Sequence, residues 1–522
     1  MLGIRGWTTG VGVFALGAAA LLAGTASAVA APATYGNIEP DRAASLTVHK
    51  YLHQNGSFTG DPSQQPADGD FSDPVAGVTF TAYPLIKNGS AVDLTDSAVW
   101  PTLKDITPGA GCTAPAGYTL GTPVALPKTD ATGTATAALS QTVYQVCETD
   151  APANIVDMAL PFIVTLPMPY ENGWVYDVQA YPKNGAGEIV KTVSPQQDMG
   201  LGSVVTFPVT SPIPTMQDVW KSWAITDVLD ARLTPEGTGV GAVTVDGSPL
   251  DPSYYTASVQ GQKVIVEFTN AGVAWLNEGH AGAKVTIDFQ GKITAVGDGT
   301  IENQADLWVN NPDRDPSVRP PLPSNEVATH WGSLQVLKRA AGTTPPVGAR
   351  GDLRGLEVLK RAAGTTGEPG RLLEGAVFNV YQAADPYATD CSAATKTGAP
   401  VSVNGVTDFV SGGDGVISVK GLFVSDSEND PVDAPQRCYV LVEVKAPAGY
   451  VLPANPDSPV TVKIGATPVT ANVAILNTQA EVPELPLTGA KGELLLISFG
   501  AAAVILAIVL IAFNRRRKVL RD

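Results

Sequence analysis

The sequence predicts an all-β protein built from tandem β-sandwich domains. Runs of Val, Thr and Ala recur at short spacing between Gly and Pro residues, and no long amphipathic helical pattern interrupts them. Without its two apolar ends the chain keeps about 450 residues, which is too many for one hydrophobic core, so two to four domains are expected. The net charge of -17 argues against a nucleic-acid partner.

The N-terminal end reads as a secretory signal peptide. Arg5 supplies a positive charge, a short apolar stretch follows, and Ala26–Ala28 fits a signal-peptidase site. We therefore expect residues 1–30 to be removed and exclude them from the fold. The remaining chain is expected outside the cell.

The C-terminal end carries a second apolar segment. Leu494–Phe513 is as long as the ~20 residues that a membrane-spanning helix needs, and the basic residues Arg515–Lys518 follow it, as on the cytoplasmic side of a membrane. Just upstream lies a short motif in an acidic stretch, where proline excludes both a helix and a central strand. We expect an accessible strip that a protease-like enzyme binds in extended form: Leu485, Pro486, Leu487, Thr488 and Gly489.

Composition and turn residues predict the domain limits. We expect an N-terminal sandwich over 31–170, a middle sandwich over 171–331, a C-terminal sandwich over 332–480, and the anchoring segment over 481–522. Because an exported chain meets an oxidising environment, its four cysteines are expected to pair within domains. The expected disulfides are Cys112–Cys147 and Cys391–Cys438.

Polar residues fall on inward strand faces in an unusual pattern. Alternate residues of a strand share a face, and by this rule two domains each place a Lys, an acid and an Asn among apolar residues. Burial favours a neutral amine and a protonated acid, so the amine can attack the Asn amide and release ammonia. From alternation alone, a buried ion pair with a hydrogen-bonded Asn is the simpler interpretation. The two sets are Lys191, Asp227 and Asn303, and Lys360, Glu443 and Asn477.

The N-terminal domain departs from this pattern. Lys50 has Leu46 and Val48 on its face, and Glu148 lies in "YQVCETDAP", but the expected closing strand "FIVTLPMP" contains no Asn. We therefore expect no covalent cross-link between side chains there other than the disulfide.

Several motifs together resemble the sortase-assembled shaft pilins of Gram-positive bacteria, in particular actinobacterial fimbriae. "YVLVEVKAPAGYVL" resembles their E-box, "WVYDVQAYPK" (174–183) their pilin motif, and "THWGSLQVLKR" and "LLEGAVFNVY" the first strands of immunoglobulin-like, Cna-B-type domains. The motif Leu485–Gly489 with its apolar span resembles a cell-wall sorting signal. The resemblance implies a structural subunit that is not an enzyme and needs no cofactor.

The resemblance also assigns roles to residues. A pilin-specific sortase is expected to cut after Thr488 and transfer its carboxyl group to Lys183 of an identical subunit, making a head-to-tail polymer. Lys183 precedes Asn-Gly-Ala-Gly and is expected on an exposed turn. A housekeeping sortase, peptidoglycan and a minor or tip pilin are the other expected partners, with adhesion to a host as the role of the fibre.

The same resemblance implies internal isopeptide bonds Lys191–Asn303, with Asp227, and Lys360–Asn477, with Glu443. Alternatives remain at three positions. "LQVLKRAAGTT" (334–344) recurs as "LEVLKRAAGTT" (356–366), and Lys360 is preferred over its counterpart because it precedes "LLEGAVF". The alternatives are Asp230 for Asp227, Asn325 for Asn303, and Lys338 for Lys360.

Two other functions are alternatives to a shaft subunit. A monomeric wall-anchored adhesin would share the anchor but would not need the amine of Lys183. A secreted hydrolase is disfavoured because the four His residues accompany no nucleophile-elbow or HExxH pattern. The acidic stretch 426–433 is expected to be a solvated loop rather than a calcium site.

Overall fold

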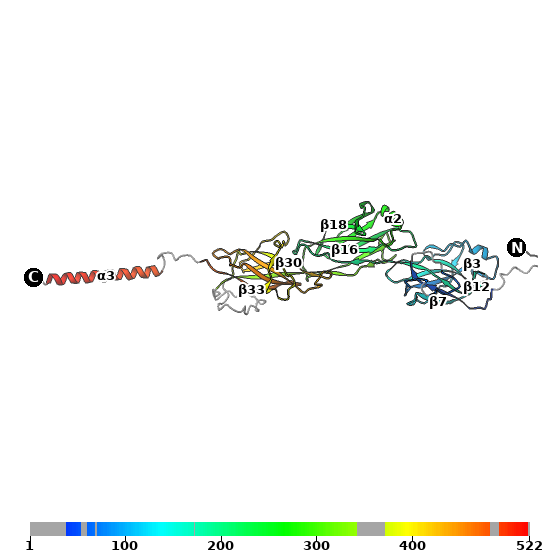
Figure 1. Cartoon of the computed structure of the whole chain (residues 1–522), viewed down its shortest axis with the longest axis horizontal. Helices are drawn as coiled ribbons and strands as arrows, with labels where there is room; N and C mark the ends of the chain where they lie inside the picture. Colours follow the sequence, from blue (N-terminus) through cyan, green and yellow to red (C-terminus); the bar gives the residue numbers. More distant parts are fainter. Residues whose placement is uncertain are drawn as a thin grey trace, which may run out of the picture. The chain divides into compact units, whose positions relative to one another are not determined.

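The computed structural model describes residues 38–53, 60–67, 70–171, 173–341, 371–480 and 490–519. Its folded part divides into two compact units. The first ends at Ala186 and also includes Thr215–Asp218, and the second comprises Gly187–Pro214 and the chain from Val219 onward. Strands dominate both units (Figure 1), so the prediction of an all-β fold is confirmed.

The first unit is a β-sandwich with small additional sheets. One face is the sheet β13-β1-β7, and the other is a six-stranded sheet centred on β3 and β8. Leu46 and Val48 of β1 join Phe80 of β3 and Val146 of β8 in one buried core. The strands are β1 (Ala44–His49), β2 (Tyr51–Leu52), β3 (Thr79–Lys87), β4 (Ser90–Ala91), β5 (Thr119–Leu120), β6 (Val124–Ala125), β7 (Thr134–Leu139), β8 (Thr142–Asp150), β9 (Ile155–Asp157), β10 (Phe162–Leu166), β11 (Met168–Tyr170), β12 (Gly173–Val175), β13 (Asp177–Ala180) and β14 (Lys183–Ala186).

The end of this unit corrects a sequence prediction. We placed the boundary at residue 170, but β13 pairs in parallel with β1, and β14 pairs with β2 and β9. The strands of the "WVYDVQAYPK" stretch therefore complete the N-terminal sandwich, and the boundary lies after Ala186. The strand edges of the sandwich still carry backbone N–H and C=O groups that need partners, and these later segments supply them.

The second unit begins with two five-stranded sheets, β15-β16-β22-β18-β19 and β20-β21-β17-β24-β25. Buried and less buried residues alternate regularly in the first sheet. Strand β16 buries every second residue, and Phe207 pairs with Phe289 of β22. The strands are β15 (Val190–Lys191), β16 (Val204–Pro212), β17 (Trp223–Val228), β18 (Leu233–Val245), β19 (Ser248–Pro249), β20 (Tyr255–Gln260), β21 (Lys263–Phe268), β22 (Lys284–Ile293), β23 (Thr300–Asn303), β24 (Ala305–Val309) and β25 (Leu322–Pro323).

The long strand β26 leads into the C-terminal sandwich. Its first residues pair with β23, its pairing with β30 begins at Thr329, and its pairing with β33 begins at Gly332. The boundary that we placed at 331/332 therefore falls inside an uninterrupted strand. A second sheet is centred on β27 and β31. The strands are β26 (Val327–Ala340), β27 (Val377–Ala383), β28 (Lys396–Thr397), β29 (Phe409–Val410), β30 (Val416–Asp426), β31 (Gln436–Lys445), β32 (Asp457–Lys463) and β33 (Gly465–Asn477).

Helices are few in the described parts of the chain. Besides α1 (Trp100–Leu103), α2 (Asn270–Asn277) and three single 3-10 turns, the structure has α3 (Ala490–Val519). Within α3, Leu496–Phe513 has the length and the mean hydropathy of 2.8 that suit a membrane span. At 1.5 Å per residue, these residues extend about 27 Å, close to the hydrocarbon thickness of a bilayer.

Candidate functional site

A buried polar cluster lies in the middle sandwich. The Lys191 ammonium contacts the Asp227 carboxylate, and the amide nitrogen of Asn303 donates to the same carboxylate oxygen over 3.3 Å. All three residues are buried. The Lys191 Nζ also lies 5.1 and 5.6 Å from the ring centroids of Phe207 and Phe289, which close the site to water. The fold therefore brings together the three residues that were predicted from the sequence to form one set.

Burial has opposite effects on the two charged partners. It lowers the pKa of Lys191, and it raises the pKa of Asp227, in each case because the charged form loses its hydration. A neutral amine beside a protonated acid is the pair of states that attack on an amide requires.

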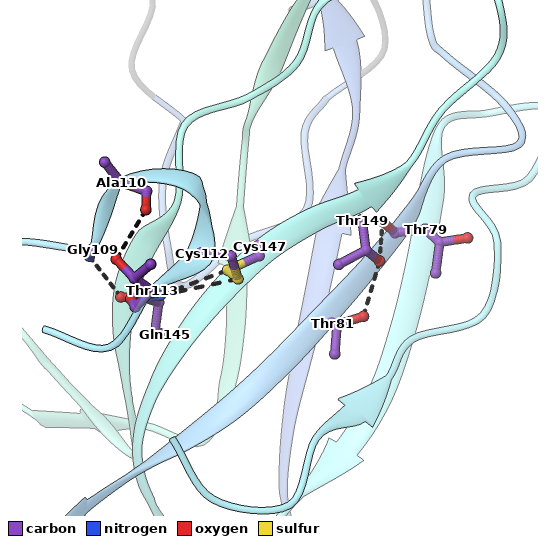
Figure 2. The surroundings of a disulfide bond; sticks show 9 residues. All are labelled: Thr79, Thr81, Gly109, Ala110, Cys112, Thr113, Gln145, Cys147 and Thr149. Carbon is purple, nitrogen blue, oxygen red and sulfur yellow. Dashed lines mark hydrogen bonds between the residues drawn. A yellow bond between two sulfur atoms is a disulfide. The ribbon is translucent and has the colours of Figure 1, made fainter. Parts of the chain in front are cut away.

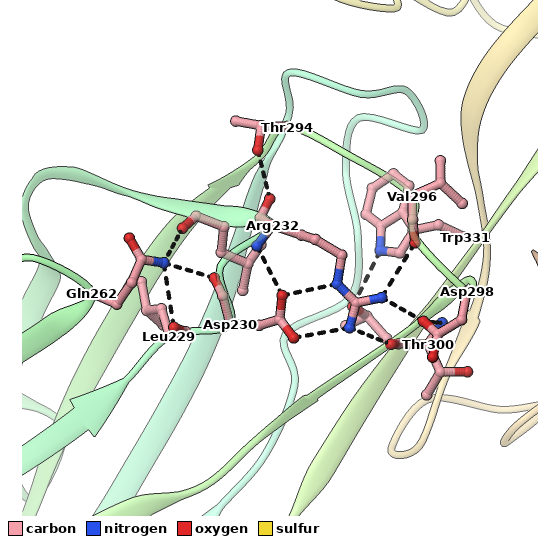
Figure 3. A network of polar contacts seen from close by, with 11 residues as sticks. Leu229, Asp230, Arg232, Gln262, Thr294, Val296, Asp298, Thr300 and Trp331 are labelled. Atoms are coloured by element: carbon pink, nitrogen blue, oxygen red, sulfur yellow. Dashed lines mark hydrogen bonds and ion pairs between the residues drawn. The ribbon is translucent and has the colours of Figure 1, made fainter. Parts of the chain in front are cut away.

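Two alternative residues are engaged elsewhere. Asp230 accepts from Arg232 Nε and Nη2, each over 2.8 Å, and Arg232 also contacts Asp298 (Figure 3). This guanidinium lowers the pKa of Asp230. Asn325 instead hydrogen-bonds the backbone of Lys191, accepting from its N–H over 2.8 Å and donating to its carbonyl over 2.9 Å. Asp227 is therefore the acid that contacts the Lys191 amine, and Asn303 is the asparagine that donates to the Asp227 carboxylate.

A second cluster lies in the C-terminal sandwich, and it contains Lys338. The Lys338 Nζ lies 2.8 Å from Glu443 Oε2 and contacts the amide oxygen of Asn477, whose nitrogen donates to Glu443 Oε1 over 2.8 Å. Burial lowers the pKa of Lys338. The preference for Lys360 is therefore replaced by Lys338, because β26 supplies the strand beside β33. Lys360 lies outside the described residues.

A third cluster, which the sequence analysis did not anticipate, lies in the N-terminal sandwich. The Lys50 Nζ is 2.8 Å from Glu148 Oε2, and the amide nitrogen of Asn184 donates to Glu148 Oε1 over 2.7 Å. The Asn184 oxygen accepts from the N–H of Ala159 over 3.0 Å. Burial lowers the pKa of Lys50 to about 8, against the opposing charges of Glu148 and Asp157. The arrangement repeats that of the C-terminal cluster, with one carboxylate oxygen for each partner.

The misplaced domain boundary explains why this cluster was missed. The predicted domain ends at residue 170, whereas Asn184 lies on β14, one residue beyond Lys183. Lys50 and Glu148 had both been recognised. A lysine and an acid on inward faces, with no asparagine to complete the set, indicated that the domain continues past residue 170.

Lys183 does not occupy an exposed turn, and that prediction is wrong. It is the first residue of β14, pairs with Tyr51 of β2, and is half-buried. Its Nζ lies 5.3 Å from the ring centroid of Phe71. The side chain still reaches the surface, as an amine that reacts with another molecule must.

Both predicted disulfides are confirmed. Cys112–Cys147 ties the turn at Ala110–Cys112 to β8, and Cys391–Cys438 ties a turn to β31. Around the first, Gln145 accepts from the N–H of Gly109 and donates to the carbonyl of Thr113 (Figure 2). The disulfide and this glutamine hold the same loop.

Two other predicted features can be placed. Leu485, Pro486, Leu487, Thr488 and Gly489 lie outside the described residues, directly before α3. In the acidic stretch 426–433, the buried Asp426 carboxylate accepts from the N–H groups of Glu428 and Asn429. This side chain therefore shapes its own loop.

Comparisons with known proteins agree with this arrangement. Residues 41–185 match the family described as "Gram-positive pilin subunit D1, N-terminal domain", and residues 477–519 match the "LPXTG cell wall anchor motif". The first match ends close to Ala186, where the N-terminal sandwich ends. A pilin domain, further sandwiches and a wall anchor define a cell-wall-anchored pilin of Gram-positive bacteria.

Full-length relatives identify the family more closely. The chain is 38% identical to "Fimbrial subunit type 2" of Actinomyces naeslundii, over 94% of this chain and 93% of that protein. It is 29% identical to "Fimbrial subunit type 1" of Actinomyces viscosus, over 97% and 96%. The full-length major pilin SpaD from Corynebacterium diphtheriae is similar in structure, with a TM-score of 0.62, 28% identity, and coverage of 85% of this chain and 99% of that chain. The chain belongs to the Actinomyces fimbrial subunit family and is a shaft subunit of a pilus anchored to the cell wall.

Proposed function

We propose that a pilin-specific sortase joins Thr488 of one subunit to Lys183 of the next. The sortase thiol replaces Gly489 on the Thr488 carbonyl carbon, and the Lys183 amine then displaces the thiol. One N–C bond forms as the C–S bond breaks, and the thiol regains a proton. The half-buried amine at the start of β14 supports this role, together with the Leu-Pro-Leu-Thr-Gly motif before α3.

We further propose that each sandwich is closed by a Lys–Asn isopeptide bond. The observation that carries this proposal is the threefold occurrence of one arrangement, in which a buried carboxylate contacts both a buried lysine and an asparagine amide. The proposed bonds are Lys50–Asn184, Lys191–Asn303 and Lys338–Asn477.

The geometry suggests one reaction for all three. The neutral lysine Nζ attacks the side-chain carbonyl carbon of Asn, a C–N bond forms, and the bond to Nδ2 breaks. The acid polarises the carbonyl group and carries a proton from Nζ to the departing nitrogen, which leaves as ammonia. The reaction occurs once, within the chain itself, so it is maturation of a structural subunit.

The finished polymer implies further partners. A housekeeping sortase would transfer the last subunit to peptidoglycan, and a minor or tip pilin would end the fibre. Covalent bonds between and within subunits suit a thin fibre that supports adhesion under load.

The Lys183 amine is the feature that separates a shaft from a monomeric wall-anchored adhesin. Wall extracts of cells that produce the wild-type chain should give a ladder on denaturing gels, and the ladder should collapse to one band with Lys183→Ala. Lys128→Ala is the matched control, because Lys128 makes an exposed ion pair with Asp150. An unchanged ladder with Lys183→Ala would exclude Lys183 as the linkage site, and a single band from all three chains would support the adhesin.

A further inference from the structure

The surroundings of Lys183 contain a group of aromatic rings that the proposed linkage does not itself require. The Phe71 ring stacks against Tyr51, with centroids 4.6 Å apart, and against Tyr181, with centroids 5.4 Å apart. His49 stacks on Tyr181 at 5.2 Å. Lys183 lies at the edge of this group, with its ammonium 5.3 Å from the centroid of Phe71, within the range of a cation–π contact.

Phe71 comes from a segment far from β14 in sequence. The described residues 60–67 and 70–73 precede β3, yet their backbone is attached to β13 and to Tyr181, just before the strand that carries Lys183. The N–H of Gln179 donates to the carbonyl of Pro62 over 2.9 Å, and the Tyr181 hydroxyl donates to the carbonyls of Asp61 and Gln64. We name the described residues 60–67 and 70–73 the covering segment.

Two further observations show how closely the covering segment packs. A Cβ atom at Gly60 would overlap the Tyr181 ring, so the backbone of the segment lies directly on that ring. Burial beneath the segment, with the charges of Asp61 and Asp70, raises the pKa of Tyr181 to about 12. The attachment therefore holds Phe71 against the residues that lead into β14.

We propose that Phe71 is a positioning residue for the sortase reaction, and that the covering segment holds its ring where it fixes the Lys183 amine for attack on the thioester. This inference rests on the proposed role of Lys183. A lysine side chain samples many rotamers, and an aromatic face that attracts its ammonium restricts them. A restricted amine meets the enzyme-bound carbonyl carbon in a reactive orientation more often, which raises the rate within the complex. The ring makes no bond to the reacting carbon.

The test measures transfer of a donor peptide to the full chain. The acceptor is the full chain in detergent carrying Thr488→Ala, so that it cannot act as a donor. The probe is a fluorescent peptide with the sequence of residues 481–489, and the enzyme is the pilin-specific sortase. Phe71→Leu, which keeps an apolar side chain without a ring, should lower kcat for the acceptor about two- to fivefold with little change in KM. This change corresponds to about 0.5–1 kcal/mol, the usual size of an exposed cation–π contact.

Matched variants make the result specific. Phe71→Tyr restores a ring and should restore kcat. Tyr118→Leu removes the ring 5.2 Å from Lys87, an equivalent lysine–aromatic contact elsewhere in the same domain, and should leave both constants unchanged. Wild-type kinetics in a folded Phe71→Leu chain, or a rise in KM alone, would overturn the positioning role. Transfer at the wild-type rate in Lys183→Ala would instead overturn the proposed linkage, so the two failures are distinguishable.

A second measurement does not depend on the folding of a Phe71 variant. Reductive dimethylation with a carbon-13 label keeps the lysine charge and gives each lysine an NMR signal, and Lys183→Arg assigns the signal of Lys183. We expect this signal to be shifted upfield by the ring current of Phe71. A signal at the position of freely exposed lysines would overturn the proposal.

Discussion

Replacing Asn184 with alanine removes the carbon atom to which Lys50 is proposed to bond. The mature wild-type chain should weigh about 51 Da less than its sequence requires, beyond the hydrogens lost to disulfides, because each of three bonds releases ammonia of about 17 Da. Asn184→Ala should reduce this deficit to about 34 Da. The contacts of Asn184 and Lys50 with opposite oxygens of Glu148, over 2.7 and 2.8 Å, are the basis of the expectation.

The same change should lower stability. A Lys50–Asn184 bond would close a loop of about 135 residues, and the chain-entropy relation for a cross-link of this length gives about 5 kcal/mol. Without Asn184, the buried Glu148 Oε1 also loses a hydrogen-bond donor, which costs about 1–3 kcal/mol, whereas the N–H of Ala159 keeps Glu148 Oε2 as an acceptor. The loss of stability therefore has two sources, whereas the mass difference reports the bond alone.

Intact-mass spectrometry of the purified chain is the assay, followed by peptide mapping of the cross-linked fragment. Glu148→Gln should also retain the extra 17 Da, because the amide cannot carry the proton to the leaving nitrogen. Lys128→Ala should leave the deficit at its wild-type value. A wild-type deficit of about 34 Da, with unmodified Lys50 and Asn184 peptides, would refute the reasoning.

Three more expectations follow from the clusters. Asp227→Asn should abolish the middle bond and restore about 17 Da, whereas Asp230→Asn, which breaks only the pairing with Arg232, should leave the mass unchanged. Lys338→Ala should restore about 17 Da and Lys360→Ala should not, as measured by intact mass. Since burial lowers the pKa of Lys50 to about 8, the Lys50–Glu148 pair loses its shared proton above that pH. A neutral amine beside a protonated acid carries the same single proton as the ion pair, so bond formation in freshly refolded chain, followed by mass, should change little from pH 6 to pH 7 and should slow above about pH 8.

Alternation along strands was sufficient to find most of the residues in the buried clusters of lysine, acid and asparagine. Ile189, Lys191 and Val193 are all buried, because a strand with one face on a core repeats every second residue. The two cysteine pairs could be predicted because an exported chain meets an oxidising environment and the paired cysteines lie near each other in the sequence. These features depend on local pattern, which a single sequence records directly.

Features that depend on which strands pair were harder to predict from the sequence. The parallel pairing of β13 with β1 joins residues more than 120 positions apart, and nothing local in either strand specifies its partner. For this reason the prediction from the sequence placed the end of the N-terminal domain too early, left Asn184 out of that domain, and put Lys183 in a turn. The duplicated "VLKRAAGTT" segment raised the same difficulty, since both copies fit a first strand and only tertiary packing selects Lys338.

The positions of the proposed bonds determine which parts of a loaded fibre carry tension. Force would enter a subunit at Lys183 and leave at Thr488, and the side-chain bonds would divert it around residues 192–302 and 339–476. Between the two diversions the path follows 304–337, which includes β24, β25 and the start of β26, where β26 pairs with β23, β30 and β33. Residues 38–182 precede the entry point, so unfolding of the N-terminal sandwich would not lengthen the fibre. The Lys50–Asn184 bond then serves a different purpose from the other two, since it fastens that sandwich to the residue beside the linkage and protects it from proteolysis. The full covalent path is Lys183, Lys191, Asn303, Lys338, Asn477 and Thr488.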